Sequence, residues 1–379
     1  MWGTRPKIGT AECQLLKHSL DGLSRMLTSM PNAQLDLDTH PTETAEDVPT
    51  HARIGGRQYR VSKVFWAYWK FAVERQAVFF RRLRGLEPWT DDPIIKAFKF
   101  TNPYRASDRV SQYMIREVAY RGEQTCNEIF FRIILFKLFN KIETWELLKA
   151  HVGDISFKDY RYEQYDSVLS KALDSGRKIY SAAYIMPSGG SSESRKHRVH
   201  LALLDKMMRD EAPSRISDVE HMVDAFKLLR SYRGIGDFLS YQFVTDLNYS
   251  TLCNFGEMDF VMPGPGAKDG IRKCFPEIDI ASSAEMIRLV AETQEEHFKT
   301  VGQTFVNLWG RSLKLIDCQN LFCEVDKYSR SAHPDILGIS GRTRIKQRYR
   351  PSPLPLKLFY PPKWGINELI PADLRAACA

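Results

Sequence analysis

Several features of large protein classes are missing from this 379-residue chain. No segment approaches the roughly 20 uninterrupted apolar residues of a membrane-spanning helix, and the first residues, MWGTRPKIGT, lack the apolar core of a secretion signal. The GxxxxGK[ST] spacing of a P-loop is also absent, which argues against a P-loop kinase. We therefore expect an intracellular protein with no membrane partner, located in the nucleus if its source is eukaryotic and in the cytoplasm or nucleoid if the source is a phage or a bacterium.

Metal-binding and disulfide patterns are missing as well. The seven cysteines are an odd number and form no CxxC pair, and the nine histidines form no cluster at metal-ligand spacing. The one close pair, Cys318 and Cys323, has no second pair that would complete a zinc site. This usage is typical of reduced, buried thiols, so we predict no metal site and no bound cofactor.

Acidic residues are missing from one long stretch near the C-terminus. The chain has 54 Lys+Arg against 46 Asp+Glu, a net charge of +8. No acidic residue lies between Asp335 and Glu368, whereas Arg342, Arg344 and Lys346 do. Such a stretch is typical of contacts to a phosphate backbone or of nuclear import, and we predict DNA contacts for these three side chains. An exposed solubilising tail is the alternative.

Composition divides the chain into four parts. Residues 1–30 include one amphipathic segment that predicts an N-terminal helix, and residues 31–53 are polar, acidic and marked by proline, which predicts a flexible linker. Residues 54–335 are dense in aromatic and aliphatic side chains and form the expected folded domain. Residues 336–379 form the basic, proline-rich C-terminal tail.

Helical periodicity dominates the folded domain. Apolar residues recur every three or four positions, and the S/T-x-x-E pattern of a capping box occurs at Thr125–Glu128, ahead of the apolar segment IFFRIILFKLF, and again at Ser217–Glu220. Strand candidates are few, and turn signals do not recur at hairpin spacing. We therefore predict an all-α, mainly helical protein with a central buried helix after Thr125.

The most specific local signal is SYRGIGDFLSYQFVTDLNYS, which runs from Ser231 to Ser250. A helix, a short Gly-Ile-Gly hairpin and a second helix from Asp237 are typical of a helix-hairpin-helix, which we place at 218–248. Glycine lets the backbone approach closely, and the N–H groups at the start of the second helix can hold a DNA phosphate without reading sequence. We predict DNA contacts for Arg233, Gly234 and Gly236.

The segment after this motif resembles that of helix-hairpin-helix DNA glycosylases, in which a short apolar segment beyond the second helix bears the catalytic aspartate. Gly256-Glu257-Met258-Asp259-Phe260-Val261 stands at that place, so the resemblance assigns this role to Asp259. Phe238 stands where bifunctional members carry a nucleophilic lysine, which disfavours a Schiff-base lyase. The resemblance implies a two-lobed bundle of helices with a central cleft.

Three longer stretches extend the resemblance. They are FKFTNPYRASDRVSQYMIREV from Phe98, the run containing GIGDFLSYQFVTDL and GEMDFVMPGPGAKDGIRKCF, and DCQNLFCEVDKYSR from Asp317. Together they resemble the α-glutamyl/putrescinyl thymine pyrophosphorylase family, also described as the helical domain of 5-hydroxymethyl-deoxyuridine DNA kinases, over residues 61–364. Members act in thymine hypermodification, where a phosphorylated 5-hydroxymethyluracil in DNA is substituted by an amine.

That chemistry requires an extruded base, a grip on the phosphoryl leaving group and a group that deprotonates the amine. The expected catalytic residues are Asp259, Glu324 and Lys327, of which the last two can instead be a structural ion pair. Lys268 lies in PGPGAKDG, where either a phosphate nest or a tight turn between helices is expected. The other side chains expected to bind substrate or phosphate, each with a buried polar network, an ion pair or core packing as its alternative, are Asn102, Arg105, Asp108, Arg109, Gln112, Gln242, Asp246 and Tyr328.

The expected function is that of an enzyme that replaces the phosphate or pyrophosphate on 5-hydroxymethyluracil in DNA with an amine or amino acid co-substrate. The expected partners are double-stranded DNA with modified thymine and a separate 5-hydroxymethyluracil DNA kinase. A monofunctional glycosylase that excises a modified base and a non-catalytic module that binds modified DNA are the two alternatives.

Overall fold

The computed structural model describes residues 48–182, 186, 195–352 and 355–376. The predicted N-terminal helix and most of the predicted linker lie outside these residues. Helices dominate the described part of the chain, as the hydrophobic periodicity predicts, and its strands are the antiparallel pair β1 (His51–Ile54) and β2 (Arg57–Arg60). The all-α prediction is therefore confirmed, although the last residues of the predicted linker form β1.

One group of helices surrounds α2 (Lys63–Leu83), whose apolar face is buried from Val64 to Phe80. Ser62 fixes the start of α2, because its Oγ accepts a hydrogen bond from the Val64 N–H at 3.0 Å and donates to the carbonyl of Lys273 at 2.5 Å. The remaining members of this group are α3 (Pro93–Ala97), α12 (Pro265–Cys274), α13 (Ser283–Glu292), α14 (Gln294–Thr300) and α15 (Leu315–Ala332).

Helices α12 and α15 pack unusually closely, because α12 carries glycine at its contact positions. A Cβ atom at Gly270 would lie 2.0 Å from the carbonyl oxygen of Phe322, and one at Gly266 would lie 2.4 Å from Cys323 Sγ. The segment PGPGAKDG is therefore mostly helix from Pro265 onward, so the expected tight turn between helices is wrong. The expected phosphate contact of this segment stays a prediction. The glycines of α12 serve helix packing.

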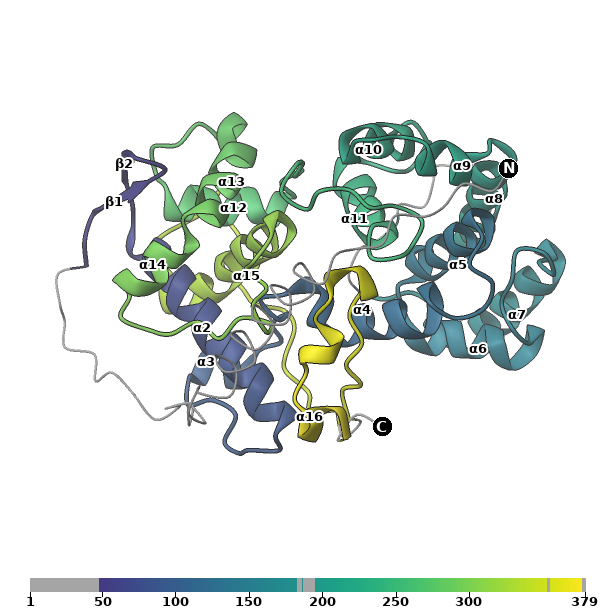
Figure 1. Ribbon diagram of the computed structural model, residues 1–379, viewed down its shortest axis with the longest axis horizontal. Helices are drawn as coiled ribbons and strands as arrows, with labels where there is room; N and C mark the ends of the chain where they lie inside the picture. The colour runs from purple at the N-terminus through teal and green to yellow at the C-terminus, as the bar shows by residue number, and fades with distance from the viewer. Residues whose placement is uncertain (1–47, 183–185, 187–194, 353–354, 377–379) are drawn as a thin grey trace, which may run out of the picture. The chain divides into compact units, whose positions relative to one another are not determined.

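The second group surrounds α5 (Cys126–Phe139), which is buried on every side from Glu128 to Phe139 (Figure 1). The prediction of a central buried helix is confirmed, but the capping box is wrong. Glu128 instead accepts hydrogen bonds from the N–H groups of Phe157 and Lys158 at 2.9 and 3.0 Å. The other helices of this group are α6 (Ile142–Val152), α7 (Tyr162–Asp174), α8 (Lys196–Arg209), α9 (Ala212–Ser217), α10 (Met222–Arg230) and α11 (Asp237–Leu247).

The box predicted at Ser217–Glu220 is also wrong, because α9 ends at Ser217 and α10 begins only at Met222. Between the two helix groups lie a 3-10 turn, Arg105–Ser107, helix α4 (Arg109–Tyr113) and a wide helical turn, Met114–Ala119. Two surface hollows of about 540 and 240 Å³ lie beside α6 and α7, and none of the predicted site residues lines them. The central cleft therefore stays a prediction.

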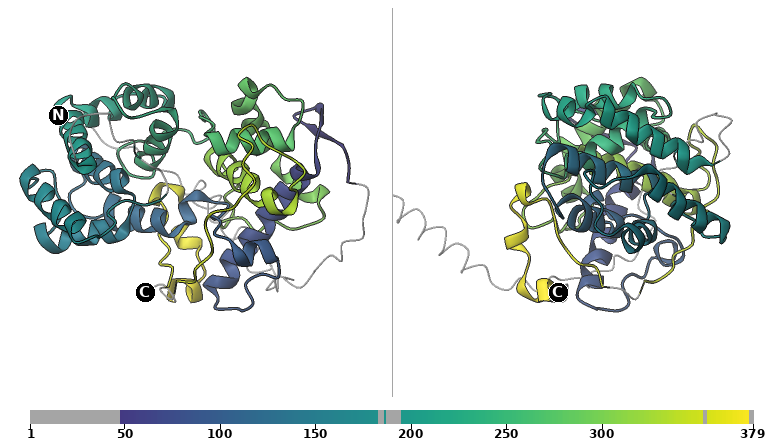
Figure 2. Two further views of the ribbon diagram at one scale, coloured as in Figure 1. Left: turned by 180° about the vertical axis from the view of Figure 1, so that it is seen from behind. Right: turned by 90° about the vertical axis from the view of Figure 1, so that its right-hand side faces the viewer.

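The C-terminal segment packs against the body along the junction of the two helix groups, before α16 (Ala372–Ala376) (Figures 1 and 2). Tyr360 is fully buried, and its hydroxyl lies 2.9 Å from Ser107 Oγ. Lys363 Nζ donates to the carbonyl oxygens of Ser250 at 3.2 Å and Cys253 at 2.5 Å. Much of the expected tail is thus part of the folded structure. None of the described helices combines the length and the apolar character needed to cross a membrane.

Candidate functional site

The turn between α10 and α11 has the geometry expected from its glycines. Gly234 has a φ of +88°, and Gly236 is the N-cap of α11, whose first turn receives no side-chain cap from the described residues. Arg230 Nε donates to Asp237 Oδ1 at 2.5 Å and ties the two helices together. Arg233 is exposed at the tip of the turn. The uncapped N–H groups and this guanidinium form an arrangement that suits an anion.

Asp259 is exposed on the segment that follows α11. The neighbouring Phe260 packs between the two helices, with ring centroids 5.0 Å from Phe226 and 5.8 Å from Tyr241. Arg288 holds the main chain by donating to the carbonyl oxygen of Asp259 at 2.8 Å. The carboxylate folds over Gly256, where a Cβ atom would lie 2.2 Å from Asp259 Oδ2. A fixed main chain thus presents a solvent-facing carboxylate.

Helix α12 begins beside the start of α11. Gly264 is the N-cap of α12, and a Cβ atom there would lie 2.6 Å from the ring of Phe238, which is in the first turn of α11. Lys268 is partly exposed on the second turn of α12. We use the name turn surface for Arg233, Gly236, Asp259, Gly264 and Lys268. It joins the starts of α11 and α12, the cations of Arg233 and Lys268 and the carboxylate of Asp259, while Asp237 in the first turn of α11 is paired with Arg230.

Arg105 lies in a buried polar network that spans both helix groups. Its guanidinium donates to both carboxylate oxygens of Asp246, at 2.7 and 2.9 Å, and to Gln242 Oε1 at 3.0 Å. Lys137 Nζ forms a second ion pair with Asp246, at 3.0 Å. Gln242 also donates to Gln319 at 3.5 Å. The structure therefore brings together predicted residues from distant segments, but as a buried network, which was the alternative to a pocket.

Two further predicted residues hold main-chain segments. Asn102 is buried, and its Nδ2 donates to the carbonyl oxygen of Ser107 at 2.8 Å. Gln112 is buried, donates to the carbonyl oxygen of Ala106 at 2.7 Å and accepts from the N–H of Phe359 at 2.7 Å. Their polar groups are thus used inside the protein.

Burial perturbs several acids and bases around this network. It raises the pKa of Asp317, which caps α15 and accepts from the N–H of Arg105 at 2.9 Å, to about 6. It raises the pKa of Asp108 to about 7. Burial lowers the pKa of Lys137 to about 8, although Asp246 opposes the shift. Burial would raise the pKa of Asp246 itself, but Arg105 and Lys137 hold it below its usual range.

Glu324, Lys327 and Tyr328 do not converge on a common point. Glu324 is buried and accepts from Lys327 Nζ at 2.7 Å and from the N–H of Thr101 at 3.0 Å. The hydroxyl of Tyr328 instead donates to Asp92 at 2.7 Å, the residue that caps α3. The pair Glu324–Lys327 thus has the geometry of a structural ion pair, while the ammonium lies 4.7 Å from the ring centroid of Phe100.

The remaining predicted cations lie along the C-terminal segment. Arg109 donates to the carbonyl oxygen of Pro355 at 3.3 Å, and burial lowers the pKa of Arg109. Arg342 is half-exposed and pairs with Asp269 at 2.6 Å. Arg344 and Lys346 are exposed. The last three side chains remain accessible to a polyanion.

Sequence reasoning missed two participants. Lys137 interrupts the apolar segment IFFRIILFKLF, and a single cation inside a buried helix was the available signal that a carboxylate partner exists. Arg311 pairs with Glu257 at 2.6 Å and stacks 3.5 Å from the ring centroid of Trp364. No local sequence pattern predicts the cluster of Arg311, Glu257 and Trp364, because these residues come from three separate segments of the chain. Among the residues described, no group of three or more His, Cys, Asp and Glu side chains is placed to hold a metal ion, and the described cysteines are free thiols.

Comparison with known proteins adds the biological context. Residues 62–338 match the family model described as 5-hmdU DNA kinase, helical domain. A curated relative, the 5-hmdU DNA kinase of Bacillus phage SP10, is 23% identical over 299 residues, which cover 72% of this chain and 46% of the kinase. The chain thus matches about half the length of that relative. No solved structure matches.

Proposed function

The chain belongs to the family of helical domains of 5-hmdU DNA kinases, and from this premise we propose that it acts on 5-hydroxymethyluracil in double-stranded DNA. The family match covers most of the described helices, from α2 to α15. The proposal is supported by the turn surface, which offers the N-terminus of α11, the exposed Arg233 and the partly exposed Lys268 for phosphates. The exposed carboxylate of Asp259 at that surface is the observation that carries the proposed chemistry.

The proposed reaction is a substitution at the exocyclic methylene carbon of the modified base. The lone pair of an amine or amino acid nitrogen forms a C–N bond to that carbon, while the C–O bond breaks and its electron pair leaves with phosphate or pyrophosphate. The proton of the attacking nitrogen passes to Asp259. Cations of the turn surface stabilise the leaving phosphoryl group electrostatically.

The phosphoryl group has to be installed before this step. Because the sequence has no P-loop, we assign the phosphorylation to a separate kinase or to a region that this chain does not share with its relative. We assign a helix-hairpin-helix, glycosylase-like architecture to the DNA-binding part. This assignment is supported by helices α10 and α11, by the glycine turn that joins them and by Asp259, which follows α11.

The test is a nucleoside analysis of DNA that contains 5-hydroxymethyluracil. Duplexes are incubated with the protein, with and without a 5-hydroxymethyluracil DNA kinase and ATP, and with putrescine or amino acids as donors. Mass spectrometry of the digested DNA is expected to show a new aminated nucleoside only when kinase, ATP and donor are all present. Asp259→Asn is expected to reduce its formation by about 100-fold or more, while Asp218→Asn, at another exposed carboxylate, leaves it unchanged.

A monofunctional glycosylase is the second candidate, favoured by the position of Asp259 directly after the glycine-linked helices. In that reaction Asp259 positions water and stabilises the positive charge that develops on the sugar. Abasic sites without any aminated nucleoside would establish this candidate and refute the substitution. DNA binding without either product, unaffected by Asp259→Asn, would identify a non-catalytic module.

A further inference from the structure

The loop after α15 exposes two large apolar side chains. We name residues 333–342 the clamp loop. Leu337 is 56% exposed and Ile339 is 57% exposed, whereas the adjacent Ile336 packs against the hydrophobic core. Two large apolar side chains exposed on one loop form a small apolar patch, and such patches can mark interaction sites.

The clamp loop is held by a buried carboxylate of α12. Asp269, whose side chain is 2% exposed, accepts from the N–H of Ser340 at 2.8 Å, from the Ser340 hydroxyl and from Arg342 at 2.6 Å. Although burial alone would raise it, these hydrogen bonds and the charge of Arg342 hold the pKa of Asp269 below its usual range. The main chain directly after Ile339 is therefore fixed to α12.

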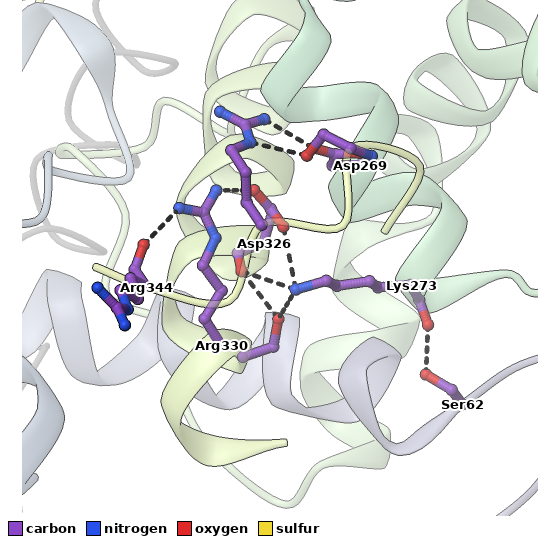
Figure 3. A network of polar contacts seen from close by, with 9 residues as sticks. Ser62, Asp269, Lys273, Asp326, Arg330 and Arg344 are labelled. Atoms are coloured by element: carbon purple, nitrogen blue, oxygen red, sulfur yellow. Dashed lines mark hydrogen bonds and ion pairs between the residues drawn. The ribbon is translucent and has the colours of Figure 1, made fainter. Parts of the chain in front are cut away.

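A second network fixes the chain further along. Lys273 Nζ lies 3.0 Å from Asp326 Oδ1, and both side chains are buried between α12 and α15 (Figure 3). Arg330 also contacts Asp326 and donates to the carbonyl oxygen of Arg344 at 3.0 Å. The apolar pair thus projects from a loop that is anchored on both helices, which reduces the entropy lost when the pair enters a partner.

The clamp loop is bound to Asp269, the residue that follows Lys268 of the turn surface on α12. Asp269 is one helical turn beyond Pro265, the first residue of α12, and the N-cap of α12 touches Phe238 at the start of α11. Arg342, Arg344 and Lys346 follow the apolar pair directly, and no acidic residue follows until Glu368. On the other side, Asp335 precedes the pair and is neutralised by Lys63, 3.1 Å away. An apolar tip followed by several cations is complementary to a stack of bases between two phosphate backbones.

We propose that Leu337 and Ile339 form a wedge that enters the base stack of the duplex bound at the turn surface, while Arg344 and Lys346 grip the adjacent phosphates. Apolar wedges of leucine or isoleucine unstack a base step and are found with arginine and lysine that hold the backbone. The wedge fills the space that an extruded base leaves and so favours extrusion. This inference rests on the proposed function, because it requires that the chain bind duplex DNA.

The test uses a duplex with one 5-hydroxymethyluracil beside 2-aminopurine, whose fluorescence rises when it is unstacked. Wild-type protein is expected to raise the fluorescence on binding. Leu337→Ala/Ile339→Ala is expected to lose about half of that rise or more, with the salt dependence of binding unchanged because no phosphate contact is removed. Leu369→Ala, at a leucine that is also 57% exposed, is the matched control and should behave as wild type.

Replacing the two cations is expected to change the salt dependence of binding and to leave the fluorescence rise unchanged. Arg344→Ala/Lys346→Ala is expected to weaken binding and to lower the slope of log K against log salt by about 1.8, since each phosphate contact contributes about 0.9. At saturating protein this variant retains the fluorescence rise. Circular dichroism checks that all three variants keep the wild-type helix content.

The possible failures are distinguishable. A wild-type protein that does not bind the duplex refutes the proposed function together with the wedge. A wild-type protein that binds and raises the fluorescence, with Leu337→Ala/Ile339→Ala doing the same, refutes the wedge alone. A change of oligomeric state caused by that double variant, measured by sedimentation, assigns the apolar pair to contact between copies of the chain and also refutes the wedge.

Discussion

Asp246 and Asp259 lie close together in the sequence, yet their environments in the folded protein are opposite. Asp246 is buried on α11, where it neutralises Arg105 and Lys137. Asp259 lies on the segment just beyond α11 and is exposed, with no side-chain hydrogen bond or ion pair to any described residue. The first carboxylate is committed to holding two helix groups together, whereas the second is accessible to a substrate.

The difference shows how position decides the role of a charged residue. A charge on a helix that is packed on all sides requires a partner, because an unpaired ion in the interior is very unfavourable. A charge on an exposed segment is solvated and has no such requirement. The following changes test this contrast between the buried network and the turn surface, in order of decreasing expected effect.

The largest effect is expected for Asp246→Asn. The substitution leaves the charges of Arg105 and Lys137 in the interior without their carboxylate, which should lower the free energy of unfolding by about 3–5 kcal/mol. Urea denaturation followed by circular dichroism measures this loss. Asp259→Asn is the control and should stay within about 0.5 kcal/mol of wild type. A small loss at Asp246 would mean that the network contributes little to folding.

The second effect is a pH dependence that Asp317 produces. Burial raises its pKa to about 6 in the folded protein, so the unfolded chain releases this proton near pH 4 while the folded protein keeps it. The contribution of this group to stability is therefore greatest near pH 4 and falls by about 2–3 kcal/mol as the pH rises to 6. Thermal or urea unfolding of Asp317→Asn, which cannot titrate, should lack this decline. Equal pH profiles for the two proteins would contradict the assignment.

The third effect concerns the orientation of Asp259. In Gly256→Ala the new Cβ would lie 2.2 Å from Asp259 Oδ2, so the carboxylate has to move. We expect the proposed modification to slow by about tenfold or more, since small misplacements of a reacting group have large kinetic effects. Nucleoside mass spectrometry at fixed times measures the rate. Asn254→Ala, at an exposed residue of the same segment, is the control and should keep the wild-type rate. If Gly256→Ala also kept the wild-type rate, the orientation of the Asp259 carboxylate would not limit the reaction.

The smallest effect is expected at the tip of the glycine turn. Arg233→Ala removes one exposed cation, so the slope of log K against log salt should fall by about 0.9 and the affinity for duplex DNA by a few-fold. Fluorescence anisotropy over a range of salt concentrations measures both. Arg57→Ala, at an exposed arginine of β2, is the matched control and should change neither. An unchanged slope for Arg233→Ala would show that Arg233 does not contact a DNA phosphate and would contradict the placement of this turn in the DNA-binding surface.

Local sequence patterns predicted the elements well where the signal lies within one helix. The apolar segment after Thr125 became the central helix α5, and the Gly-Ile-Gly pattern became the turn between α10 and α11. Patterns that require a specific hydrogen bond were less reliable. Glu128 did not close a capping box, because the main chain at Phe157 and Lys158 supplied competing donors. Those donors are distant in sequence and could not be anticipated.

The candidate site shows the same division. Gln242 and Asp246 were correctly recognised as polar residues that interrupt an apolar helix, but the sequence left open whether they line a pocket or form a network. For Arg105 it left open whether the side chain binds an anion, is solvated or forms an ion pair. The structure resolves this because each finds its partner within the protein. The function of Asp259 is still a proposal, supported by its place after α11 and by its exposure.

The sequence by itself determined the helical class, the absence of a P-loop, the glycine turn and the resemblance to the 5-hmdU DNA kinase helical domain, because each is carried by residue types at short or ordered spacing. Only the tertiary structure decided which charges are buried and paired, that PGPGAKDG belongs to a closely packed helix, and that Leu337 and Ile339 stay exposed. Burial depends on segments far apart in the chain, and it is this long-range packing that separates a structural ion pair from a side chain available for chemistry.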